Sequence, residues 1–183
     1  MEIAPLVHDK NITDPKRLEL VKSVLNEFEA SFLPRMKELR RSIIHNDANA
    51  SNIIVNAGES DGTWQIGFID FFDMIHSCTI FELAICLAYL MALHPKPFQI
   101  AKALLSAYHE EFPISPLEIE VLPTLIKARL ATSVALSAQK RHEEPENEYL
   151  FINEESGWIL LETLSALDSE SFTCILKGAC DTK

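Results

Sequence analysis

The sequence predicts an α+β protein that is mostly α-helical, with one small β-hairpin in its first half. Long segments place apolar residues at helical spacing, whereas residues 53–69 contain two short apolar runs separated by a turn cluster. The chain has 183 residues, of which 48% are hydrophobic, and this is enough for one domain with a sizeable core. We therefore expect a single domain over residues 1–183.

The helices can be placed in order from their end signals and apolar spacing. The first should begin at Asp14-Pro15, an N-cap followed by proline at the first helical position. It should continue to about residue 30, and a short helix should follow from about 34 to 41. Further helices are expected near 79–93, 97–111, 116–140 and 153–167, with Pro123 breaking or kinking the third of them. The last fifteen residues are expected to fray.

Polar residues on either side of the hairpin have a spacing that is typical of phosphoryl-transfer sites. His45, Asp47 and Asn52 follow the pattern His-x-Asp-x4-Asn, and Asp70 ends the return strand in Ile-Asp-Phe. Phosphoryl transfer depends on positioning and charge stabilisation. We assign to Asp47 the role of accepting or orienting the proton of the attacking hydroxyl. Asn52 and Asp70 offer oxygen ligands for Mg²⁺, which prefers carboxylate, amide and water oxygens.

The order of these segments sharpens the interpretation. A short apolar run leads into the loop, residues 52–56 leave it as a strand, residues 58–62 form a turn cluster, and residues 64–69 return to Asp70. In the plainer alternative, Asp47, Asn49 and Asn52 are ordinary turn residues and Asp70 caps the next helix. Loop, strand, turn, strand and Asp in this order favour the catalytic interpretation.

These segments resemble the aminoglycoside-phosphotransferase-like (choline/aminoglycoside kinase) small-molecule kinases, and most of all the hydroxylysine kinases among them. The resemblance covers about residues 15–168 and is carried by three stretches: His45–Val55, Gly67–Met74 and Phe81–Ala84. It implies the C-terminal lobe of a protein-kinase-like fold, in which the hairpin carries the catalytic and metal residues. It also implies transfer of the γ-phosphate of GTP, or of ATP, to the hydroxyl of 5-hydroxy-L-lysine. By the same resemblance, Ile54 and Ile69 lie beneath the purine of the nucleotide, although both also fit a plain strand core.

The sequence departs from the family pattern in three respects. Asn46 replaces the usual glycine between His and Asp, a mild change because Asn tolerates left-handed backbone. Glu82 replaces the usual Asp before Leu-Ala, which weakens any transfer of a loop-orienting role to it. The chain also has no Gly-x-Gly-x-x-Gly motif, and only 44 residues precede His45. We therefore expect a truncated form, a C-terminal catalytic lobe without the N-terminal nucleotide-clamping lobe.

Composition excludes some functions and leaves others open. The formal charge of −11 argues against nucleic acid, and the longest apolar stretch is too short to span a membrane. Four cysteines without a CxxC spacing fit a reducing cytosol, with Cys78 and Cys86 expected on an apolar helix.

The acidic run 141–148 is either a solvated loop or a binding site for substrate ammonium groups. Asp73 either orients Asp70 or the loop, or caps a helix.

Two other functions remain open at this point. One is a catalytically inactive, pseudokinase-like binding module that keeps the fold and a weak metal site. The other is a metallohydrolase that uses Asp47, Asp70 and a histidine, which is disfavoured because the chain lacks the His-rich ligand sets of such sites.

Overall fold

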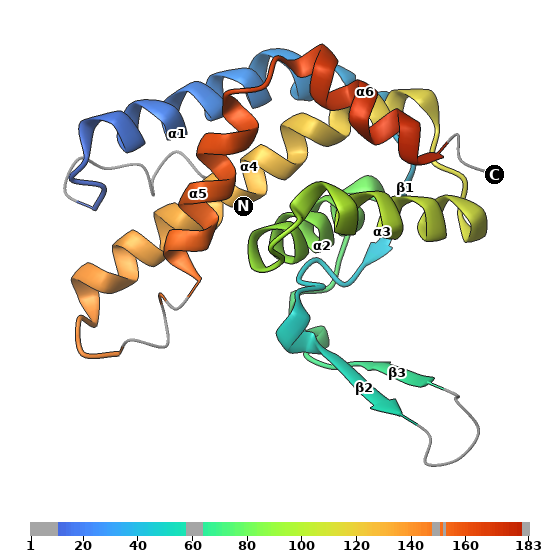
Figure 1. Ribbon diagram of the computed structural model, residues 1–183, viewed down its shortest axis with the longest axis horizontal. Helices are drawn as coiled ribbons and strands as arrows, with labels where there is room; N and C mark the ends of the chain where they lie inside the picture. The colour runs from blue at the N-terminus through green and yellow to red at the C-terminus, as the bar shows by residue number, and fades with distance from the viewer. Residues whose placement is uncertain (1–10, 58–63, 148–150, 152, 181–183) are drawn as a thin grey trace.

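The computed structural model describes residues 11–57, 64–147, 151 and 153–180, and consists mostly of helices with two small antiparallel sheets (Figure 1). This confirms the predicted class. The helices are α1 (Pro15–Glu27), α2 (Ile80–Leu93), α3 (Pro97–Glu111), α4 (Pro116–Glu143), α5 (Glu154–Ser165) and α6 (Ser169–Cys180). The strands are β1 (Arg41–Ile44), β2 (Ile53–Ala57), β3 (Trp64–Phe68) and β4 (Ile75–Cys78). Four short helices complete the order: η2 (Phe28–Phe32, a π-helix), η3 (Leu33–Glu38), η4 (Ala50–Asn52) and η5 (Phe71–Asp73).

Helix α4 is the central element, and α1, α2, α5 and α6 all pack against it. It begins with a capping box, in which Ser115 and Glu118 each accept the backbone N–H of the other. The expected break at Pro123 does not occur, because the helix continues to Glu143 with Pro123 buried inside it. Buried leucines on either side of the proline, Leu122 and Leu125, hold this turn against its neighbours.

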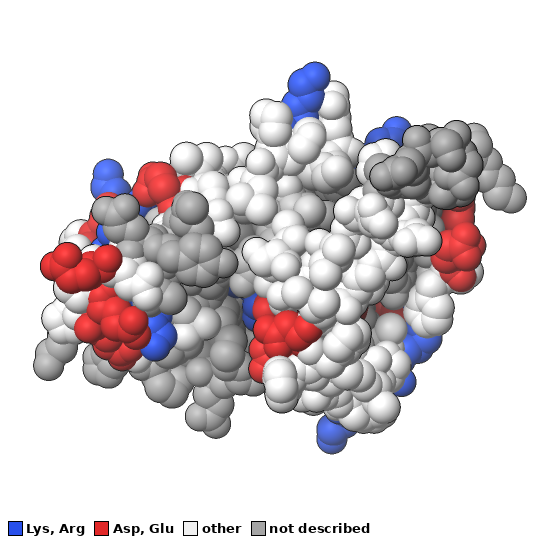
Figure 2. All heavy atoms as spheres, turned by 90° about the horizontal axis from the view of Figure 1, so that it is seen from below, with Lys and Arg blue, Asp and Glu red and all other residues white. Residues whose placement is uncertain are grey.

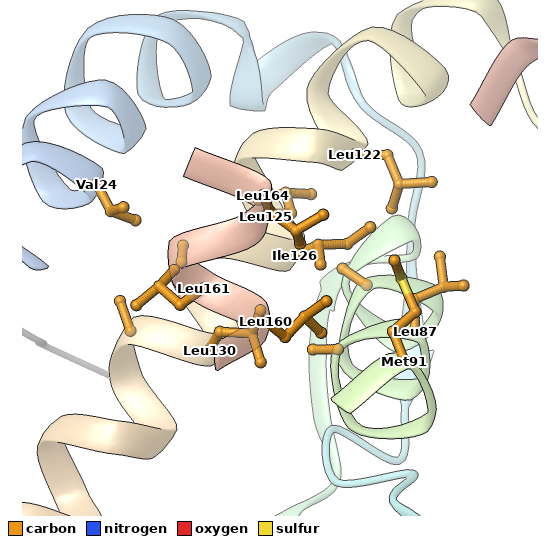
Figure 3. Close-up of a cluster of buried hydrophobic side chains, with 14 of the residues drawn as sticks. Val24, Leu87, Met91, Leu122, Leu125, Ile126, Leu130, Leu160, Leu161 and Leu164 are labelled. Carbon is orange, nitrogen blue, oxygen red and sulfur yellow. The ribbon is translucent and has the colours of Figure 1, made fainter. Parts of the chain in front are cut away.

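The core is formed where apolar faces of α1, α2, α4 and α5 meet. Figure 3 shows the side chains of these helices pointing toward one another: Val24, Leu87, Met91, Leu122, Leu125, Ile126, Leu130, Leu160, Leu161 and Leu164. All ten are buried. Burial of one such side chain contributes roughly 1.5–3 kcal/mol, so this cluster is the main source of stability and provides a rigid base for the loops.

The first helix forms as the end signals predict. The Asp14 side chain accepts hydrogen bonds from the backbone N–H groups of Lys16 and Arg17, and Pro15 occupies the first helical position. The expected helix from 34 to 41 is shorter, a 3-10 segment that ends at Glu38. Strand β1 follows at Arg41, because this stretch is paired with β4.

Two features of the fold differ from the sequence prediction. Cys78 lies on strand β4 and not on a helix, because residues 75–78 pair with β1 from Arg41↔Cys78 to Ile44↔Ile75. The fraying expected at the C-terminus is wrong for residues 169–180, which form helix α6. Its buried residues recur at positions 172, 176 and 179, and this helical spacing lets α6 pack on α3 and α4.

The β2–β3 hairpin projects away from the helices (Figure 1). Its register runs from Ile53↔Phe68 to Ala57↔Trp64. Apolar side chains on and next to it are exposed: Ile54, Val55, Trp64, Ile66, Phe68, Ile69, Phe71 and Phe72. We call these eight residues the hairpin patch. Seen from the side toward which the hairpin projects, the described surface has a broad area without Lys, Arg, Asp or Glu, and the charged side chains stand in separate small clusters (Figure 2).

Candidate active site

The loop that follows β1 is held in place by helix α2. The backbone N–H groups of His45 and Asn46 both donate to Glu82 Oε2, the second at 3.2 Å. Asn46 adopts a left-handed conformation with φ of 67°, which asparagine tolerates better than other residues with a Cβ. The longer Glu82 side chain therefore contacts the loop directly. The inference that Glu in place of the usual Asp weakens a loop-orienting role at this position is wrong.

The His45 ring connects this loop to the segment that carries Asp70. His45 Nε2 lies 2.8 Å from the carbonyl oxygen of Ile69, so the ring donates a hydrogen bond there. The ring also packs against Phe71, with 5.0 Å between the centroids. The histidine is buried and supports the loop rather than facing the cavity beside it.

Both carboxylate oxygens of Asp47 accept hydrogen bonds. Oδ2 accepts from Asn49 Nδ2 at 2.9 Å and from Asn52 Nδ2 at 3.1 Å. Oδ1 accepts from Arg129 Nη2 of helix α4 at 2.8 Å. The same nitrogen donates to Tyr89 Oη of α2 at 3.0 Å. The carboxylate is thus held by two amides of its own loop and by Arg129 of α4, which in turn contacts Tyr89 of α2.

Asn49 also has the turn role considered from the sequence, because its side chain accepts from the backbone N–H of Ser51 at 2.8 Å. Asp70 does not have the alternative role of a helix cap, since its side chain makes no capping hydrogen bond to η5. The plainer interpretation, with turn residues in the loop and Asp70 as a helix cap, therefore holds for Asn49 and does not hold for Asp70.

Asn52 and Asp70 are brought together by strand pairing. The backbone N–H of Ile69 donates to the carbonyl oxygen of Asn52 at 3.0 Å, so Asp70 follows directly after the residue opposite Asn52. Both donor hydrogens of the Asn52 amide are directed at Asp47, one to the backbone oxygen at 2.9 Å and one to Oδ2. The amide oxygen Oδ1 is therefore the atom left for a metal ion.

This donor set fits Mg²⁺, which proteins commonly bind through one or two carboxylates together with substrate phosphates and water. In the described part of the chain, no three His, Cys, Asp or Glu side chains form a metal-binding group. A site here would consist of Asn52 Oδ1 and the Asp70 carboxylate, completed by oxygens that the chain does not supply.

A cavity of about 280 Å³ opens beside Asp47, at the low end of the size range of ligand pockets. Helices α2 and α4, η2 and the segment after Asp70 surround it. Its lining is Phe28, Asn46, Asp47, Asp73, Ile75, Ser77, Phe81, Ala84, Ile85, Leu125, Ala128, Arg129 and Thr132. Asp47 lies at this cavity, whereas Asn52 and Asp70 do not line it.

The two residues expected beneath the purine, Ile54 and Ile69, also lie outside the cavity. They belong to the hairpin patch and are 53% and 44% exposed. Neither forms strand core within the described structure. The hairpin side and the cavity side of Asp47 are therefore two separate surfaces.

Asp73 lines the cavity, whereas the described residues of the run 141–147 do not. In that run Arg141 pairs with Glu154 at 2.7 Å, and Lys140 lies 3.4 Å from Glu143. Glu148 lies outside the described residues. Sequence reasoning had considered this run for an ammonium group, but the cavity brings Asp73 near Asp47 instead.

Sequence reasoning missed Arg129 and Tyr89. Arg129 is 82 residues from Asp47, and no spacing rule connects positions so far apart. One signal in the sequence could have pointed to a distant cation. Residues 42–95 contain Asp47, Asp70 and Asp73 but no Lys or Arg.

The cysteines take no part in this site. None of the four forms a disulfide in the described structure, and burial together with the nearby charge of Glu82 raises the pKa of Cys86 to about 11. No helix within the described residues is long and apolar enough to cross a membrane.

Comparison with known proteins gives consistent matches. The model of the phosphotransferase enzyme family matches residues 4–115. The chain is 30% identical over 158 residues to a hydroxylysine kinase of Mus musculus, which covers 84% of this chain and 42% of that protein. A hydroxylysine kinase of Bos taurus is 32% identical over 151 residues, which covers 80% of this chain and 40% of the relative.

A hydroxylysine kinase of Xenopus laevis is 31% identical over 159 residues, again 84% of this chain and 42% of that protein. The chain therefore spans about two fifths of the length of these relatives. The family match includes the loop, the hairpin, Asp70 and Glu82, the residues whose geometry is described above. On this evidence, the chain belongs to the phosphotransferase enzyme family.

Proposed function

We propose that this chain is the catalytic lobe of a small-molecule kinase. It transfers the γ-phosphate of GTP or ATP to the hydroxyl of a small amine-bearing acceptor, with 5-hydroxy-L-lysine as the first candidate. The observation that carries the proposal is the arrangement around Asp47. Its carboxylate faces a small cavity, and the Asn52 amide that donates to Asp47 keeps its own oxygen, Asn52 Oδ1, for a metal ion. The hydroxylysine kinase relatives support the choice of acceptor.

In the proposed reaction, the acceptor hydroxyl lies in the cavity next to Asp47. Its oxygen bonds to the γ-phosphorus as the bond from that phosphorus to the bridging β–γ oxygen breaks. The hydroxyl proton passes to Asp47, and the nucleoside diphosphate leaves with the electron pair. Asn52 and Asp70 would hold a Mg²⁺ ion, which would offset the negative charge of the phosphate groups.

The charges of the cavity support an acceptor with an amine. Asp47 and Arg129 form an ion pair, whereas Asp73 forms none within the described residues. The cavity therefore has an excess of one carboxylate, which attracts an ammonium group. Its apolar walls, among them Phe28 and Phe81, suit the carbon chain of such a molecule.

The nucleotide is proposed to bind on the hairpin side, with its purine against Ile54 and Ile69. The chain has no Gly-rich clamp motif, so a clamping lobe carried by other sequence would complete this site. The exposed hairpin patch supports this, because a two-stranded hairpin with apolar side chains needs a covering partner. A cytoplasmic location belongs to the same proposal.

The test is a nucleotide-turnover assay with 5-hydroxylysine. It uses the chain alone and the chain joined to the portion of a hydroxylysine kinase that it does not cover. We expect turnover that requires the amine-bearing acceptor and falls by about 10²–10⁴-fold in Asp47→Asn, the usual contribution of a positioned general base. Turnover that survives Asp47→Asn would contradict the mechanism. Nucleotide or acceptor binding without any turnover in either form would favour the inactive, pseudokinase-like module.

A further inference from the structure

The candidate site lacks a cation from its own part of the sequence. Residues 42–95 supply Asp47, Asn52, Asp70 and Asp73 but contain no Lys or Arg. Among the residues that line the cavity, Arg129 is the single Lys or Arg, and it comes from helix α4. Among the described residues that line this cavity, Arg129 is therefore the cation that can act on Asp47.

The guanidinium of Arg129 is itself held in place. Its Nη2 donates to Asp47 Oδ1 at 2.8 Å and to Tyr89 Oη at 3.0 Å, and its carbon Cζ lies 5.2 Å from the centroid of the Tyr89 ring. Tyr89 belongs to α2 and Arg129 to α4, two helices that pack directly on each other. The orientation of the guanidinium is thus fixed by the helical core and not by the loop.

The contacts fix the plane of the Asp47 carboxylate. Two amides, from Asn49 and Asn52, occupy Oδ2, while Arg129 alone donates to Oδ1 among the described residues. An ionised carboxylate has about four acceptor positions, so Oδ1 keeps a position for the proton of an acceptor hydroxyl. Without Arg129, only the two amide hydrogen bonds to Oδ2 would hold the carboxylate.

Two further observations argue against an ion pair that serves stability alone. The side chains of Arg129 and Asp47 are 21% and 23% exposed, and pairs that water reaches add little to folding. Arg129 Nε is buried and has no hydrogen-bond partner within the described structure. An unsatisfied buried donor costs stability, so folding alone does not account for this arginine.

We propose that Arg129 is the positioning residue for Asp47 and that Tyr89 sets its orientation. The inference rests on the proposed kinase function. Arg129 donates to Oδ1 so that the remaining acceptor position of that oxygen faces the cavity, where the hydroxyl of the acceptor lies. The proton moves to Asp47 while Arg129 holds the carboxylate in place through Oδ1.

The test compares steady-state kinetics of Arg129→Ala, Arg129→Lys and Tyr89→Phe in the form of the protein that turns over. We expect kcat to fall by about 100-fold in Arg129→Ala, the scale of a small misplacement of a catalytic group. The nucleotide KM should stay within about threefold, because the nucleotide is proposed to bind on the hairpin side and not in the cavity that Arg129 lines. Arg129→Lys should be intermediate, and Tyr89→Phe should lower kcat by a smaller factor in the same direction.

Chemical rescue separates positioning from a structural role. Added guanidinium ion should restore part of the kcat of Arg129→Ala, since it can occupy the vacated space beside Asp47. Arg35→Gln is the matched control. It removes an exposed ion pair of 2.6 Å between Arg35 and Glu120, which lies on α4 as Arg129 does but does not line the cavity. Its kcat should equal that of the unaltered protein.

The outcomes distinguish this inference from the proposed function. No turnover in the unaltered protein overturns both. Turnover with an unchanged kcat in Arg129→Ala, a loss that guanidinium does not rescue, or a change confined to KM overturns the inference alone. Should Arg129→Ala fail to fold, Tyr89→Phe decides: a lower kcat supports the inference, and an unchanged kcat overturns it.

Discussion

The contact between Glu82 and the loop that follows β1 gives a prediction that is independent of turnover. Glu82→Ala removes the acceptor for the backbone N–H groups of His45 and Asn46. A hydrogen bond to a charged group contributes about 1.5–3 kcal/mol, and an unsatisfied buried donor costs about 1–3 kcal/mol. Because Glu82 is only half-buried, we expect Glu82→Ala to lower the free energy of unfolding by about 2–4 kcal/mol. Glu82→Gln keeps an acceptor oxygen and should lose about 1–2 kcal/mol.

The assay is urea denaturation followed by the fluorescence of the buried Trp158, combined with amide hydrogen exchange. Exchange of the His45 and Asn46 amides should accelerate more than that of the core helices, because the loop loses its anchor. Glu38→Ala, at an exposed position in η3, is the control and should change the free energy of unfolding by less than about 0.5 kcal/mol. Equal stability of the Glu82 and Glu38 variants, or unchanged exchange at the two amides, would refute the reasoning.

Two further predictions concern acid stability and the hairpin patch. Burial raises the pKa of Glu118, but hydrogen bonds from Arg40 and Ser115 outweigh it and hold the pKa below the ordinary value of a glutamate. A lowered pKa in the folded state stabilises the protein above the unfolded value, and this stability is lost as the pH falls through the folded pKa. The free energy of unfolding should therefore decrease below about pH 4.5 more steeply in the unaltered protein than in Glu118→Gln, and equal slopes would contradict this. Phe72 is 97% exposed, so Phe72→Ser should change the free energy of unfolding by less than about 0.5 kcal/mol while reducing self-association in light scattering. A loss above about 1 kcal/mol would show that Phe72 is packed in solution.

Much of the fold was determined by the sequence itself. Helices α2 to α5 were predicted near their observed bounds, because apolar spacing and end signals are local properties of the chain. The hairpin strands were predicted for the same reason, whereas the turn cluster expected at 58–62 lies outside the described residues. The misses have a common cause. Strand β4 exists through its pairing with β1, and α6 through packing on α3 and α4, and such long-range contacts leave little trace in a short segment.

The candidate site divides in the same way. The spacing His-x-Asp-x4-Asn and the Ile-Asp-Phe segment were sufficient to choose Asp47, Asn52 and Asp70, because a tight loop and one hairpin register bring them close. Their roles stay predictions. The surroundings of Asp47 were decided by tertiary structure alone, since Arg129 and Tyr89 reach it only when α4 packs across α2. The sequence determined which groups can do chemistry, and the packing of helices distant in the chain decided which charge faces them, because an ion pair depends on distance in space and not on separation along the chain.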